Sequence, residues 1–172
     1  MAKGWPLLAL LLFCGCAKPA WVAYSSSIAG LEAHFPVAPV DETRSFPVGD
    51  LACVVHTLVA RKDLCEYSVS YFEYPRGIRY DEHHSIEVLA RRLKGKVVQE
   101  FASSLATSHS MQPARAFRLV LDDGRLVEGL VAAAWENTLH PHRIYQAMVV
   151  RPAQVPVKDT QDFLAGLKFL DE

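Results

Sequence analysis

Two pairs of side chains have the types and the spacing to bind a metal ion. His140 and His142 flank Pro141. His83 and Glu87 would share one face of a helix, at positions i and i+4. Zinc normally takes three or four protein ligands, so neither pair completes a site by itself. Because nothing in the sequence brings the two pairs together, we predict solvated histidines in a loop and at a helix start, and no metal site.

Cys53 and Cys65 are the cysteines of the expected folded domain, and an oxidising compartment would favour a disulfide between them. However, residues 51–60 and 64–74 are predicted to be the two strands of a hairpin that turns at residues 61–64. This register separates the two cysteines by roughly 23 Å, whereas a disulfide needs Cα atoms within about 7 Å. We therefore predict two unpaired, buried thiols; the alternative is a bonded pair with a different hairpin.

The remaining candidates are a short basic run and any catalytic motif. Arg91, Arg92, Lys94 and Lys96 could dock an acidic partner or lipid headgroups, but we expect a solvated helix face. A Gly-x-Ser-x-Gly elbow, a His-Glu-x-x-His pair, a Walker loop and a dinucleotide-binding glycine pattern are all absent from the sequence. We predict no catalytic residues and no cofactor; a hydrolase whose site residues are dispersed along the chain is the alternative.

The elements that position these residues follow from hydrophobic spacing. Apolar residues recur every three or four positions from Asp81 to about Phe101, which predicts a helix capped by Asp81 or Ser85. Gly95 interrupts this stretch, so the helix either stops there or bends.

Further elements are indicated in the second half of the chain. Strands at 114–121 and 126–135 flank Asp123-Gly124, a strong hairpin signal. Residues 142–151 form a strand that is apolar on both faces and therefore central, and residues 160–170 form a helix capped by Asp159 or Thr160. This order predicts an α+β fold with a mainly antiparallel sheet of about six strands, flanked by amphipathic helices.

Composition indicates one folded domain. Of the 172 residues, 51% are hydrophobic and 22% are charged, which is enough apolar material for an ordinary core. The formal net charge of −1 argues against a strong non-specific field for nucleic acid, so we expect no nucleic-acid partner.

The first residues have the pattern of an export signal. Lys3 precedes an uncharged run whose centre, residues 7–13, is apolar. That run is shorter than the roughly 20 apolar residues that span a bilayer, so it is typical of a signal peptide. The sequence Phe13-Cys14-Gly15-Cys16-Ala17 resembles the bacterial lipoprotein signal, with Phe13 where Leu, Val or Ile is usual.

The resemblance to the lipoprotein signal implies that Cys16 becomes the lipid-attached N-terminus, carrying acyl chains such as palmitate. It also implies, through Ala17 in place of Asp, an outer-membrane location facing the periplasm. The alternative is ordinary signal cleavage after Ala17, which would release a soluble exported protein. We accordingly divide the chain into a signal peptide at 1–15, a lipid-attached tether at 16–30 and a single α+β domain at 31–172.

The domain resembles the Mog1/PsbP-like superfamily, whose bacterial members include many uncharacterised envelope lipoproteins. The matching stretches are the strand at 67–71 that ends before Pro75, residues 113–117 before the Asp-Gly turn, residues 143–145, and residues 163–169. The superfamily has no shared catalytic motif, and its members mostly serve as binding or assembly subunits. The resemblance therefore implies a non-catalytic, lipid-anchored envelope protein that binds another envelope protein. A small-ligand or metal-binding periplasmic protein is the alternative.

Overall fold

In the computed structural model, the described residues are 21–48, 51–74, 80–134 and 142–170. They contain two helices and one sheet of ten strands. The helices are α1 (Glu82–Arg92) and α2 (Lys158–Ala165). The strands are β1 (Val22–Ser26), β2 (Leu31–Phe35), β3 (Val40–Val48), β4 (Leu51–Lys62), β5 (Cys65–Tyr74), β6 (Gly95–Ala106), β7 (Met111–Leu121), β8 (Leu126–Ala134), β9 (His142–Arg151) and β10 (Lys168–Phe169).

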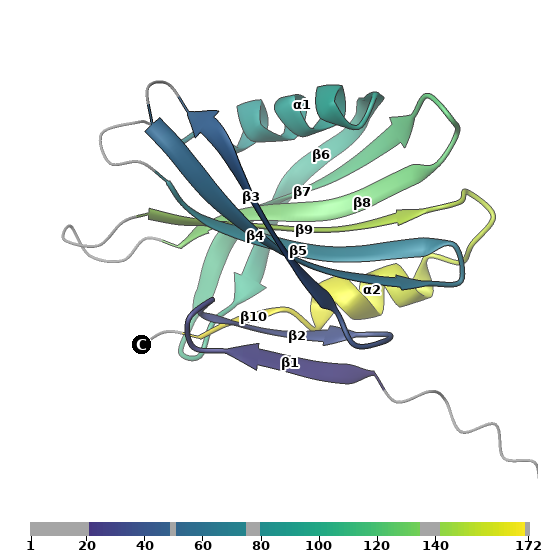
Figure 1. Ribbon diagram of the computed structural model, residues 1–172. Coiled ribbons are helices and arrows are strands. Elements are labelled where there is room, and N and C mark those ends of the chain that lie inside the picture. The colour runs from purple at the N-terminus through teal and green to yellow at the C-terminus, as the bar shows by residue number, and fades with distance from the viewer. Residues whose placement is uncertain (1–20, 49–50, 75–79, 135–141, 171–172) are drawn as a thin grey trace, which may run out of the picture.

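The strands lie in the order β1-β2-β10-β6-β7-β8-β9-β5-β4-β3. Neighbouring strands are antiparallel, apart from β10 and β6, which are parallel. The sheet curls strongly, so that β1 and β2 lie beneath β4 and β5 in Figure 1. Helix α1 lies over β6, β7 and β8, and α2 packs against β2, β8 and β9 on the other face. No helix among the described residues is long and apolar enough to cross a membrane.

Each face of the sheet has its own hydrophobic core. The inner core lies within the curl and includes Phe35, Tyr67 and Phe163. The centroid of the Phe163 ring lies 5.4 Å from that of Phe35 and 5.4 Å from that of Tyr67. The outer core lies beneath α1, where Ile86 and Leu119 are fully buried. Because strand side chains alternate between the two faces, β7 to β9 contribute to both cores, which explains their nearly continuous apolar sequences.

The expected hairpins are confirmed. In the β4–β5 hairpin, Lys62 pairs with Cys65 around Asp63 and Leu64, which both have positive φ, as this tight turn requires. Strands β7 and β8 join through the predicted Asp-Gly turn, where Gly124 has φ of 83°. Strand β9 lies between β8 and β5, so its predicted central position is also confirmed.

The predicted strand number and the predicted extent of the first helix are wrong. The described sheet has ten strands rather than about six. The helix expected to about Phe101 ends at Arg92, so of the two alternatives at Gly95 the stop is confirmed and the bend is wrong. Asp81 is its cap, accepting a hydrogen bond from the backbone N–H of His84 at 3.1 Å. A Cβ at Gly95 would lie 2.7 Å from the Leu121 side chain, so glycine permits the close approach of β6 to β7.

Two further predictions on segment ends are wrong. Strand β1 occupies residues 22–26 of the expected tether and pairs with β2. It was missed because this short edge strand buries little apolar surface. The last helix is Lys158–Ala165, begins after Val157 with no side-chain cap, and is followed by β10. Its last predicted residues instead return to the sheet, where the N–H of Leu170 donates to the carbonyl of Gly30.

Candidate functional site

The basic run, defined as Arg91, Arg92, Lys94 and Lys96, lies where α1 passes into β6. The two arginines are in the last turn of α1, Lys94 is in the connection, and Lys96 is the second residue of β6. All four side chains are exposed, as predicted. Positive charge in the last turn of a helix is favoured by the helix dipole. That effect accounts for the two arginines but not for the two lysines beyond the helix.

These four cations have no carboxylate partner within the described ranges. The other seven described arginines all form ion pairs with carboxylates: Arg44, Arg61, Arg115, Arg118, Arg125, Arg143 and Arg151. The fold therefore neutralises its arginines everywhere in the described chain except at the end of α1. An accumulation of unpaired positive charge attracts negatively charged partners and raises their association rate.

Strand β6 leaves one of its sides largely unpaired. β7 pairs with β6 from Gly95 to Ala106, whereas β10 contributes the single pair of Lys168 with Ala106 on the other side. Alternate residues of an antiparallel strand direct their N–H and C=O groups to opposite sides. Among the described residues, no strand pairs with the outer groups of β6 before Ala106. We call the outer side of residues 99–105 the β6 edge; a bulge between Val97 and Gln99 separates it from Lys96.

Two large apolar side chains are exposed on this strand. Val98 is 55% exposed and Phe101 is 50% exposed. The terminal strand β3, an edge strand of the whole sheet, is different: Glu42 and Arg44 pair there at 2.9 Å, and Pro47 lies near its end. Charges and proline on an edge strand discourage pairing with another chain. Residues 99–105, which form the β6 edge, contain one charged side chain, Glu100, and no proline. We use the name β6 surface for the basic run, the β6 edge, Val98 and Phe101 together.

A cluster of charged side chains connects α1 to Glu100 of β6 and Arg115 of β7. His83 Nδ1 lies 2.8 Å from a carboxylate oxygen of Glu100, and its Nε2 lies 3.5 Å from Glu87. Arg115 reaches Glu100 at 3.1 Å and Glu82 at 3.8 Å. The predicted proximity of His83 and Glu87 is confirmed. The hydrogen bond and the charge of Glu100 raise the pKa of His83, so the cluster is an ion-pair network that holds α1 against β6 and β7.

The described residues include no group of three or more His, Cys, Asp or Glu that could hold a metal ion. His83 directs its two ring nitrogens to two different carboxylates, so these ligands do not converge on one point. His140 lies outside the described residues, and His142 is placed only by its backbone at the start of β9. Cys16, the predicted lipid attachment site, also lies outside the described residues.

Cys53 and Cys65 are both unpaired and buried. Cys53 is on β4 and lies opposite Phe46 of β3, whereas Cys65 is the first residue of β5 and lies opposite Lys62 of β4. The predicted separation by the hairpin is therefore confirmed. Burial raises the pKa of both thiols, which keeps them in the unreactive protonated form.

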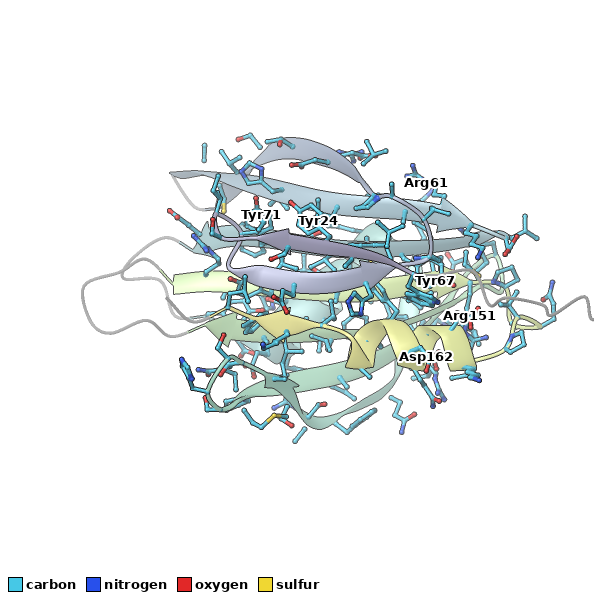
Figure 2. The ribbon with its side chains drawn as sticks, turned by 90° about the horizontal axis from the view of Figure 1, so that it is seen from below. Tyr24, Arg61, Tyr67, Tyr71, Arg151 and Asp162 are labelled. Atoms are coloured by element: carbon cyan, nitrogen blue, oxygen red, sulfur yellow. The ribbon has the colours of Figure 1, made fainter. Side chains whose placement is uncertain are left out.

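The inner core contains a buried ion network that sequence analysis missed. The carboxylate of Glu128 accepts hydrogen bonds from Arg118 at 2.7 Å and from Arg151 at 3.2 Å. A second nitrogen of Arg151 donates to the carbonyl of Val155 at 2.7 Å, which ties β9 to the segment before α2. Figure 2 shows Arg151 and Tyr67 beside α2. The sequence pattern predicted that each of the three residues lies on a strand. It did not predict that the strands pair so that their side chains meet.

An apolar cavity of about 10 Å³ lies in the inner core, lined by residues that include Leu31, Tyr145 and Phe169. Small-molecule sites usually have volumes of about 300–1,000 Å³. This cavity is thus a packing void with room for about one water molecule, and it supplies no support for the small-ligand alternative.

The exposed apolar residues of the β6 surface were also missed. Val98 and Phe101 were assigned to a helix, because Val97 continues the helical spacing of Ile86, Leu89 and Leu93. Gly95 indicated that the helix could stop, but a strand after it was not predicted. In the structure Lys94, with φ of 54°, ends the helical path and Gly95 begins β6.

Comparisons with known proteins agree with this architecture. No model of a protein family matches the chain, and no curated protein matches it. Among solved structures, the chain is similar to the solution structure of cyanobacterial PsbP (CyanoP) from Synechocystis sp. PCC 6803, with a TM-score of 0.53. The two share 12% sequence identity over 90% of this chain and 95% of that chain. The protein therefore has a PsbP-like α+β fold, and the resemblance is confirmed at the level of the fold.

Proposed function

We propose that this protein is a non-catalytic, lipid-anchored component of the cell envelope that acts as a binding or assembly module through its β6 surface. The observation that carries the proposal is the coincidence of four unpaired cations with an open strand edge and exposed apolar side chains. An edge of this kind is a template for another chain, and proteins that do not use one usually block it.

The anchor in this proposal is the acylated Cys16, on the outer membrane and facing the periplasm. Acyl chains contribute about 0.8 kcal/mol per buried methylene, so two or three of them hold a domain at a bilayer without a basic patch. Five residue steps separate Cys16 from Trp21, the residue before β1. They span at most about 18 Å when fully extended. The short separation would keep the start of β1 near the membrane.

Mass spectrometry of the protein isolated from its native membrane tests the anchor. We expect an N-terminal Cys16 that carries two or three acyl groups, including palmitate. A Cys16→Ser variant should lose the acyl mass and the membrane association together. A mature protein that begins at Lys18 without acyl mass would contradict the anchor and leave a soluble exported protein.

Site-specific photocrosslinking in the native envelope tests the binding surface. A photoreactive phenylalanine analogue at Phe101 should give a discrete crosslinked species with another envelope protein. The same analogue at Val40, an exposed apolar residue of the edge strand β3, is the matched control. Equal crosslinking from both positions, or none from Phe101, would contradict the β6 surface as the binding site.

A further inference from the structure

The β6 surface has the features that recognise an extended, acidic polypeptide segment. We infer that the partner supplies such a segment and that it adds to the sheet as a further strand along the β6 edge, with its carboxylates facing the basic run. The inference rests on the proposed function, because it names what the binding surface takes.

The backbone of β6 is the first argument. A neighbouring strand pairs with the outer side of β6 only at Ala106, among the residues that the structure describes. The stretch from Gln99 to Leu105 is free of the bulge and pairs regularly with β7 on its inner side. Unpaired N–H and C=O groups on a regular strand accept a peptide in extended form, and the main-chain hydrogen bonds supply affinity.

Charge determines which peptide fits. An added strand paired with residues 99–105 spans about 20 Å, and about three further residues of its chain would pass the bulge and reach Lys96. Its end near Lys96 would also lie close to Lys94, which immediately precedes β6, and to the last turn of α1. Carboxylates at that end would neutralise cations that no described carboxylate pairs with. A basic or neutral segment would leave the cations uncompensated, so the surface selects an acidic one.

Phe101 provides an apolar contact within the same strand. It lies opposite Ala116 of β7 and is half exposed, and among the described residues no strand pairs with β6 beside it on the outer side. A side chain directly across from it on an added strand would lie about 5 Å away and would cover the ring. An aliphatic or aromatic residue at that position of the partner segment would bury apolar surface that is now in contact with water.

Two other occupants fit these observations less well. Anionic lipid headgroups would match the cations but would not pair with backbone groups along the strand. A second copy of this chain would bring its own β6 edge, whose one acidic residue is Glu100. Glu100 is already held by His83 and Arg115.

The test uses the purified full-length protein in detergent and three labelled peptides of about ten residues, the length of an ordinary strand. One alternates threonine and valine with glutamate, the second has lysine in place of glutamate, and the third is the acidic peptide interrupted by two prolines. Fluorescence anisotropy should show saturable binding of the first alone, at concentrations up to about 1 mM. Binding should weaken as salt is raised. Hydrogen exchange should slow at alternate backbone amides between Gln99 and Leu105 when that peptide binds.

Matched variants separate the contribution of the basic run from that of Phe101. Arg91→Glu with Arg92→Glu, and separately Phe101→Ser, should each weaken binding at least about tenfold. Lys158→Glu, at an exposed cation on α2, and Val40→Ser, at an exposed residue of β3, should leave it unchanged. All five substitutions alter exposed or half-exposed side chains, and circular dichroism verifies that each of the four variants is folded.

Several outcomes would overturn the inference. These are equal binding of the proline-interrupted peptide, equal binding of the basic peptide, no binding of the acidic peptide, binding to anionic vesicles in its place, and self-association that Phe101→Ser abolishes. Photocrosslinking distinguishes failure of the strand-addition inference from failure of the proposed binding function. A crosslink from Phe101 to a partner segment that is not acidic or extended would refute strand addition and leave the binding module intact.

Discussion

Removal of one buried charge at Glu128 should destabilise the protein strongly. The Glu128 carboxylate accepts hydrogen bonds from Arg118 on β7 and from Arg151 on β9. The side chain of Arg151 is 3% exposed, whereas that of Arg118 is 43% exposed. Glu128→Gln keeps the shape but removes the charge. Arg118 can then turn toward water, whereas the guanidinium of Arg151 stays buried with only neutral acceptors, namely the remaining amide oxygen at position 128 and two backbone carbonyls.

The expected size of this effect follows from burial. Removing one partner of a buried pair costs about 3–5 kcal/mol, because the other charge is left uncompensated. For a protein of this size, 1 kcal/mol shifts the melting temperature by about 2–4 °C, so the expected loss is roughly 6–20 °C. Arg61 and Glu66 provide the comparison, since they pair at 2.7 Å across β4 and β5 but are 62% and 36% exposed. Glu66→Gln should cost about 0–1 kcal/mol.

Urea unfolding monitored by circular dichroism measures both variants. The midpoint of Glu128→Gln should fall far below that of the unchanged protein, with a similar dependence on urea concentration. The double substitution Glu128→Leu with Arg151→Met should recover much of the loss, because it leaves no buried charge unpaired. A loss below about 1 kcal/mol for Glu128→Gln, equal to that of Glu66→Gln, would refute the reasoning.

Two further perturbations test the outer face and the packing of the sheet. The hydrogen bond and charge of Glu100 raise the pKa of His83 above its ordinary 6.5, so this contact stabilises the folded protein fully below pH 6.5, and the contribution is lost as the pH rises through the raised pKa. His83→Gln should remove this dependence in unfolding curves measured across pH, and identical pH profiles would contradict the assignment. A Cβ at Gly129 would clash with the carbonyl oxygen of Ala147, so Gly129→Ala should cost about 3 kcal/mol. Gly124→Ala meets no atom within 4 Å and should cost about 1 kcal/mol for its positive φ, so equal losses in thermal unfolding would contradict the close packing of β8 on β9.

Local patterns were sufficient for the hairpins and for the separation of the cysteines. The charged turn between β4 and β5 and the Asp-Gly turn between β7 and β8 each act within a few residues, so their consequences are visible along the chain. The separation of Cys53 from Cys65 follows from the first turn alone. Asp81 likewise caps α1 through a neighbour three residues away.

Other predictions failed where different structures share the same spacing. Val97 follows Leu93 by four residues, as in a helix, yet it packs beneath α1 from β6. Residues 22–26 alternate weakly because β1 lies at the edge of the sheet and exposes much of its surface. Strand β10 consists of two residues, so its pattern is too short to distinguish it from the end of a helix.

The amino-acid sequence by itself determined the local turns, the α+β class and the basic run, because each of these depends on residues within a few positions of one another. The tertiary structure alone decided which charges are neutralised and which backbone groups stay unpaired. Both properties depend on strand order: β10 ends after two residues and leaves the side of β6 open, while the carboxylates of Glu100 and Glu128 lie beside arginines other than those of the basic run. Strand order is set by contacts between residues far apart in the chain, and no local pattern encodes it.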